Sequence, residues 1–165
     1  MDDYKVIVGF MKGDYVTCFH VLSLKSNVWK HVGEVNYCHF SSIGVLCNGA
    51  LHWLMLDINE NMVIISFDLS ENKFNEIPQP DDVTCQYFMG RSECPTLGTI
   101  EDCLCVFDQE WLPKNLRKMK DYNVKGSWEM VGHDDWGIRV MSYIGCKNRS
   151  MEFDLTSRYI MMYIS

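Results

Sequence analysis

Eight cysteines and five histidines are the residues of this 165-residue chain with the widest chemical potential. Cys103 and Cys105 are spaced two apart, so both thiols would face one side of a strand. A structural zinc site needs four such ligands, and the sequence contains neither a Cys-x-x-Cys pair nor a spaced histidine pair to complete one. We therefore expect no metal site and no cofactor, and we interpret the cysteines as reduced thiols, mostly in strands or in the core.

Sequence signatures of catalysis are missing as well. The chain has no Gly-x-Ser-x-Gly, no His-Glu-x-x-His and no glycine-rich phosphate loop. Cysteine–histidine pairs can be drawn in many combinations, which makes any single pair uninformative. We expect no catalytic residue and no enzyme activity.

The composition favours a globular protein. Hydrophobic residues make up 47% of the chain and charged residues 22%, which is too apolar for a disordered segment. The formal net charge of -7 disfavours non-specific binding of nucleic acid. The chain starts with two acidic residues near its N-terminus, and no apolar run approaches the roughly 20 residues of a membrane span. We expect an intracellular protein, cytoplasmic or nuclear, with neither nucleic acid nor membrane as partner.

Short segments rich in β-branched and aromatic residues dominate the chain and are separated by turn-forming residues. We predict that GALHWLML pairs antiparallel with MVIISFDL across DINEN, and that IISFDL pairs with KFNEIP across SEN. Helix is expected only as a turn or so near residues 111–120, where Pro113 interrupts the best helix-like segment.

Two patterns recur along the chain and predict its architecture. VLSLKSNVWKHV (21–32) aligns with ISFDLSENKFNEI (65–77), and YNVKGSWEMV (122–131) is a weaker third copy; VLCNGALHWL (45–54) resembles GTIEDCLCVF (98–107). A period of about 40–50 residues with several strands per copy is typical of β-propeller blades, and chance likeness among hairpins is the alternative. We expect the aromatic repeat positions to lie in the core. The repeat positions are Leu24, Trp29, Trp53, Phe67, Asp68, Leu69, Phe74 and Trp128.

Taken in order, GALHWL, ISFDLSENKFNEIPQP and MKDYNVKGSWEMV resemble the F-box associated domain of plant F-box proteins, the kelch-like group that includes the S-locus F-box proteins. The resemblance runs from about Asp2 to Val131. The chain departs from the family pattern at Glu101-Asp102, where glycines are usual, and at Arg117-Lys118-Met119.

The resemblance implies a protein-interaction module that recognises a protein substrate for an SCF-type E3 ubiquitin ligase. A Skp-type adaptor and a cullin would be partners only if an F-box is present outside these residues. A truncated paralogue that acts only as a binding or decoy module is one alternative, and a propeller enzyme is a weaker one.

We therefore expect an all-β fold, a partial or open propeller-like stack of antiparallel sheets with about three blades. Residues 1–165 would form a single F-box associated β domain, a fragment of the family's domain, with repeat-like units near 15–44, 45–96 and 97–145 and a partial strand unit at 146–165. Unless the termini add strands that close a ring, the terminal segments YKVIVGF and RYIMMYI would lie on different end sheets and favour association. Trp111 and Trp136 are the expected partner-binding residues, because tryptophan in a loop is a common interface anchor.

Overall fold

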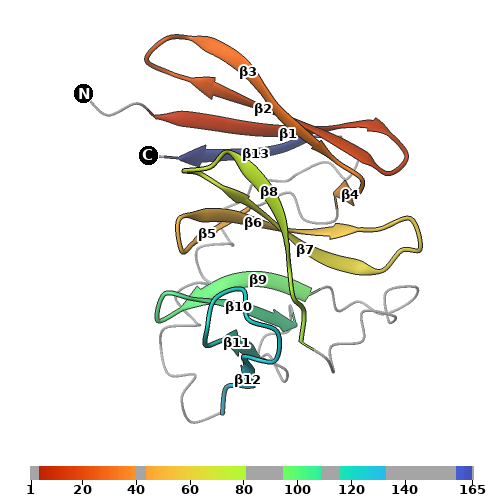
Figure 1. The fold of residues 1–165 in the computed structure, drawn as a ribbon, viewed down its shortest axis with the longest axis vertical. Helices are drawn as coiled ribbons and strands as arrows, with labels where there is room; N and C mark the ends of the chain where they lie inside the picture. Colours follow the sequence, from red (N-terminus) through yellow and green to blue (C-terminus); the bar gives the residue numbers. More distant parts are fainter. Residues whose placement is uncertain (1–3, 40–43, 81–94, 109–115, 133–158, 165) are drawn as a thin grey trace. The chain divides into compact units, whose positions relative to one another are not determined.

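The computed structural model describes residues 4–39, 44–80, 95–108, 116–132 and 159–164, and in these ranges the chain is all-β (Figure 1). Three antiparallel sheets are present, which confirms the predicted fold class. The chain divides into two compact units, Met1–Ile77 with Arg158–Ser165, and Pro78–Ser157. Over the described ranges, no helix has the length and apolar character that crossing a bilayer requires.

The first unit contains two of the sheets. The first sheet has the strand order β13-β1-β2-β3, and in the second sheet β6 is flanked by β7 and by the short strands β4 and β5, with β8 beyond β7. The strands of the first sheet are β1 (Lys5–Gly13), β2 (Val16–Ser23), β3 (Val28–Val35) and β13 (Tyr159–Ile164). Those of the second are β4 (Cys38–His39), β5 (Val45–Cys47), β6 (Ala50–Leu56), β7 (Met62–Asp68) and β8 (Lys73–Ile77).

The second unit contains the third sheet, with the strand order β12-β11-β10-β9. Its strand β11 falls within residues 111–120, where the sequence predicts a helical turn. Residues 117–119 are extended instead. The pairing of β11 with both β10 and β12 accounts for this outcome, and residues 111–115 of the same segment lie outside the described residues. The strands are β9 (Pro95–Ile100), β10 (Cys103–Asp108), β11 (Arg117–Met119) and β12 (Trp128–Met130).

Both predicted hairpins of the second sheet are confirmed. Strands β6 and β7 pair antiparallel from Ala50 opposite Asp68 to Leu56 opposite Met62. Strand β8 then returns along β7, with Phe74 opposite Phe67. The two rings lie 4.8 Å apart between centroids, which is a favourable distance for an aromatic pair.

Turns of the same geometry recur at equivalent positions of the sequence repeats. Asn27 precedes β3 and Asn72 precedes β8, and both have a left-handed φ of 53°. The turn before β6 uses Asn48 (φ 48°) and Gly49, and the turn before β10 uses Glu101 (φ 51°) and Asp102. Two consecutive left-handed residues suit a two-residue hairpin, so the non-glycine residues after β9 adopt the backbone that glycine usually supplies.

A single core joins the two sheets of the first unit. Trp53 is fully buried and Phe67 is 1% exposed, as expected, and Phe74 is partly buried against them. Trp29 is 52% exposed, so its predicted place in the core is wrong. Its side chain belongs to the other face of the first sheet, because it pairs with Leu22 rather than with a residue that packs on the second sheet.

Phe19 of β2 is the centre of this core. Its ring lies 4.8 Å from Phe74 and 5.4 Å from Trp53 between centroids. In the register it lies between Gly9 of β1 and Gly33 of β3. A Cβ atom at Gly9 would lie only 2.7 Å from Cε1 of Phe19, so glycine is required there for the ring to lie over its neighbouring strand.

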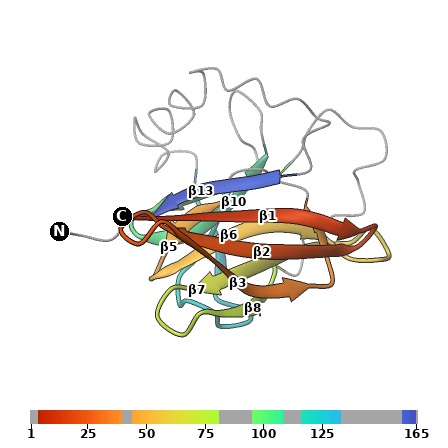
Figure 2. The same cartoon turned by 90° about the horizontal axis from the view of Figure 1, so that it is seen from above.

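The two ends of the chain meet in the first sheet. Strand β13 pairs antiparallel with β1, from Lys5 opposite Ile164 to Phe10 opposite Tyr159, and the two run side by side in Figure 2. The expectation that these segments lie on different end sheets is therefore wrong. Pairing satisfies the hydrogen-bonding edge of β1 that a terminal sheet would leave open.

Removing the Phe19 ring tests how much this core depends on it. We expect Phe19→Ala to lower the free energy of unfolding by about 3–5 kcal/mol, because a buried aromatic ring leaves a cavity between two sheets. Trp29→Ala, at a half-exposed site, should cost less than about 1 kcal/mol. Urea unfolding of both variants measures the difference, and equal losses would contradict the assignment of Phe19 to the core centre.

His52 of β6 gives the fold a pH dependence. The imidazole is fully buried, its Nδ1 lies 3.1 Å from the carbonyl oxygen of Val45, and burial lowers its pKa below 6.5. As the pH falls, the unfolded chain therefore binds the proton at a higher pH than the folded chain does. The free energy of unfolding is greatest above about pH 6.5 and falls as the pH drops below it, by at most about 1.4 kcal/mol per pH unit.

Urea midpoints at pH 7.5, 6.5 and 5.5 measure this dependence. The slope below pH 6.5 should disappear in His52→Gln and persist in the control His31→Gln, whose imidazole is exposed. A slope that survives in His52→Gln would assign the effect to another group.

Candidate functional site

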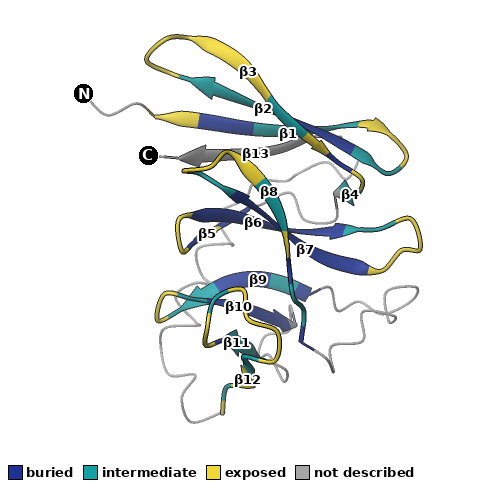
Figure 3. Cartoon of the chain, viewed as in Figure 1, coloured by how far each residue is buried: buried dark blue, intermediate teal, exposed yellow. Residues whose placement is uncertain are grey.

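The first sheet has an outer face, which is the face opposite the core that it shares with the second sheet. Strand alternation and the register assign the side chains of this face, and much of β3 is exposed (Figure 3). They form cross-strand rows that combine apolar, aromatic and ionisable groups. The outer-face residues are Val6, Val8 and Phe10 of β1, Cys18, His20 and Leu22 of β2, and Trp29, His31 and Glu34 of β3.

One end of the outer face carries an exposed apolar patch. This hairpin patch consists of Tyr4, Leu22, Leu24 and Trp29, at the start of β1 and around the β2–β3 turn. Tyr4, Leu24 and Trp29 are each at least half exposed, and the backbone N–H of Leu24 donates to the carbonyl oxygen of Tyr4 at 2.9 Å. Tryptophan and tyrosine are among the side chains that most often anchor a protein partner.

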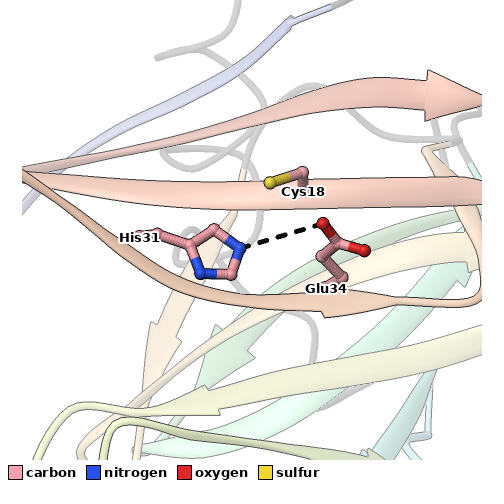
Figure 4. Close-up of side chains that lie close together, drawn as sticks. All are labelled: Cys18, His31 and Glu34. Carbon is pink, nitrogen blue, oxygen red and sulfur yellow. Dashed lines mark ion pairs between the residues drawn. The ribbon is translucent and has the colours of Figure 1, made fainter.

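Further along the same face, three side chains with metal-binding and acid–base chemistry converge (Figure 4). The sulfur of Cys18, a ring nitrogen of His31 and a carboxylate oxygen of Glu34 all lie within 4.8 Å of one another. His31 Nε2 is 4.0 Å from Glu34 Oε1. We call these three residues the outer-face cluster.

The charge of Glu34 is compensated by Lys12 of β1. The Lys12 ammonium donates to Glu34 Oε1 at 2.7 Å, and this hydrogen bond lowers the pKa of the carboxyl group and raises that of the amine. Burial of Cys18 raises the pKa of its thiol, so the sulfur is protonated at neutral pH and is a poor nucleophile. The cluster as it stands is therefore not arranged for covalent catalysis.

Aromatic contacts hold the histidine of the cluster on the outer face. His20 stacks on Phe10 with 5.2 Å between ring centroids, and the His20 and His31 rings meet edge-on with 5.3 Å between their centroids. The row from β1 to β3 thus fixes where the imidazole of His31 lies along the sheet.

A β-bulge in β3 brings His31 and Glu34 to the same face. In a regular strand, residues three apart point to opposite faces. Here Phe19 pairs with Gly33 while His20 pairs with His31, so Val32 is an extra residue and the alternation is reset. Gly33 has a φ of 145°, a backbone conformation that favours glycine.

The other sequence-predicted sites belong to the second unit or lie outside the described residues. Cys105 is buried on β10, and its thiol contacts the carbonyl oxygen of Cys103 at 3.4 Å. Trp128 is half buried and its Nε1 donates to the carbonyl oxygen of Pro78 at 2.8 Å. Trp111 and Trp136, the expected partner-binding residues, lie outside the described residues.

Sequence reasoning missed the outer-face cluster. Among the described residues it is the one group of three Cys, His, Asp or Glu side chains close enough to share a metal ion. The spacing His-x-x-Glu does not predict a shared site in a strand, because only a bulge places the two side chains on the same face. An isolated glycine, Gly33, inside a strand-like segment is the signal that could have suggested the bulge.

Comparison with known proteins agrees with this architecture. A family model described as the F-box associated beta propeller domain matches residues 1–133. The F-box protein CPR1 of Arabidopsis thaliana is 30% identical over 161 aligned residues, which cover 79% of this chain and 37% of that protein. An F-box/kelch-repeat protein of the same plant is 31% identical over 112 residues, covering 64% of this chain and 29% of the relative. The chain thus spans less than two fifths of the length of either relative.

The bulge can be tested at Gly33. A Cβ at this position would lie 3.2 Å from Cε2 of Phe74, and the backbone of Gly33 has a conformation that residues with a side chain rarely adopt. We therefore expect Gly33→Ala to lower the free energy of unfolding by about 1–3 kcal/mol. The control Gly13→Ala, where a Cβ meets nothing within 4 Å, should be nearly neutral. Urea unfolding compares the two, and the His31 imidazole resonances should move in the first variant alone. Equal behaviour of the two variants would contradict the structural role of the bulge.

Proposed function

Because the chain belongs to the F-box associated beta propeller domain family, we propose that it is the substrate-recognition module of an F-box protein in an SCF-type ubiquitin ligase. Both relatives described above are F-box proteins, which supports an interaction role rather than an enzymatic one. The Skp-type adaptor and the cullin would be contacted by an F-box elsewhere in the polypeptide. Such a module acts in the cytoplasm or the nucleus.

The exposed hairpin patch is the observation that identifies a candidate partner-binding surface. Among the described residues, eight large apolar side chains are about half exposed or more, and three of them belong to this patch. Tyr4, Leu24 and Trp29 come from two different parts of the chain that the register brings together. A rigid sheet therefore presents them side by side, which reduces the entropy lost when a partner binds.

The proposal also covers the organisation of the chain. We take residues 1–165 as one F-box associated β domain, with repeat units near 15–44, 45–96 and 97–145. The equal turn geometry at Asn27 and Asn72 supports the first two of these units.

The role of the hairpin patch can be tested by affinity purification from plant tissue. The chain would be purified as wild type, as Trp29→Ala and as the control Ile58→Ala, which removes a 71% exposed apolar side chain from the β6–β7 turn. We expect a reproducible protein partner whose recovery falls about tenfold or more in Trp29→Ala, since a central tryptophan commonly contributes 2 kcal/mol or more. Quantitative mass spectrometry measures the recovery.

Two outcomes would overturn the proposal. The first is equal recovery in all three samples, which would remove the patch from the binding surface. The second is a chain that turns over a small molecule and recovers no partner, which would favour an enzyme. A Skp-type adaptor and a cullin should be recovered when the chain is joined to an F-box and should be absent when it is not.

A further inference from the structure

We propose that the outer-face cluster is a binding site for a zinc-like divalent cation, with Cys18, His31 and Glu34 as its protein ligands. The set joins one thiol, one imidazole and one carboxylate, all of which zinc accepts. Three protein ligands leave the fourth position of a tetrahedral ion to water or to a group from a partner. The proposal is independent of the function proposed above.

The geometry needs only a small adjustment to coordinate an ion. Ligand atoms around tetrahedral zinc lie about 3.3–3.8 Å apart, given metal–ligand distances of about 2.0–2.3 Å. The three candidate atoms already lie within 4.8 Å of one another. Cys18 lies on an interior strand and is buried, whereas the side chains of His31 and Glu34 are 52% and 37% exposed, so small rotations at the surface would bring their ligand atoms closer to the sulfur.

The charges also suit a divalent cation. Binding would convert the Cys18 thiol to a thiolate, and its proton would pass to solvent. Thiolate and carboxylate together balance a charge of +2, and the imidazole binds in its neutral form. Zinc would thus replace the Lys12 ammonium as the counter-charge of Glu34, and Lys12, 60% exposed, would turn outward.

The site is built across the edge of the sheet. Cys18 lies on β2, whereas His31 and Glu34 lie on β3, the edge strand. A bound ion would therefore cross-link the edge strand to its neighbour on both sides of the bulge. The expected consequence is a more stable β2–β3 hairpin, which also carries the hairpin patch.

Titration of the reduced, metal-free chain with zinc, and with cobalt as a spectroscopic probe, tests the proposal. We expect one equivalent to bind, a sulfur-to-cobalt charge-transfer band and a rise in melting temperature. Cys18→Ser should abolish the band, and His31→Gln and Glu34→Gln should weaken binding by about tenfold or more. The control Cys47→Ser, a buried cysteine of β5, should leave binding unchanged.

Lys12→Gln provides a variant in which binding improves. Because an exposed ion pair is only weakly stabilising, removal of the competing ammonium should tighten zinc binding about two- to fivefold. A misfolded variant would bind zinc more weakly, so misfolding cannot produce the tighter binding. No binding to the wild type, equal binding in Cys18→Ser, or weaker binding in Lys12→Gln would each overturn the proposal.

Discussion

The placement of the Phe19 ring over glycine is the constraint on which the first unit depends. The ring occupies space that a side chain at Gly9 would need, and it contacts Trp53 and Phe74 of the second sheet. The two sheets can approach this closely only because β1 has no side chain beneath the ring. Burial of aromatic area between these two sheets makes a large contribution to the stability of the unit.

Features decided by local chemistry could be predicted from the sequence. The β6–β7–β8 meander follows from alternating apolar residues and polar turns, and the four-residue turn between Asp68 and Lys73 places Phe67 opposite Phe74. The fold class and the family follow from the recurrence of such hairpins. Each of these features involves residues close together in the chain, where pattern and turn type determine the register.

Features decided by distant segments could not be predicted. The pairing of β1 with β13 joins residues more than 140 positions apart, and nothing local to either strand distinguishes it from an edge. The outer-face cluster depends on one extra residue, Val32, which changes the face of every outer-face residue beyond it. Trp29 shows the same limit. It occupies the repeat position of Phe74, yet only the residues that cover each sheet decide which of the two is buried.

Gly33 connects the inner and outer faces of the first sheet. Its backbone creates the bulge that brings His31 beside Glu34, and its lack of a side chain lets the Phe74 ring approach within the space of a methyl group. Phe74 in turn contacts Phe19, so the core and the cluster share one residue as a common support. A change in the packing of Phe74 would therefore be transmitted through the backbone of β3 to the spacing of the outer-face side chains, although none of the outer-face residues named above belongs to the core that the two sheets share. The geometry of the cluster is for this reason a property of the whole two-sheet unit rather than of the hairpin alone.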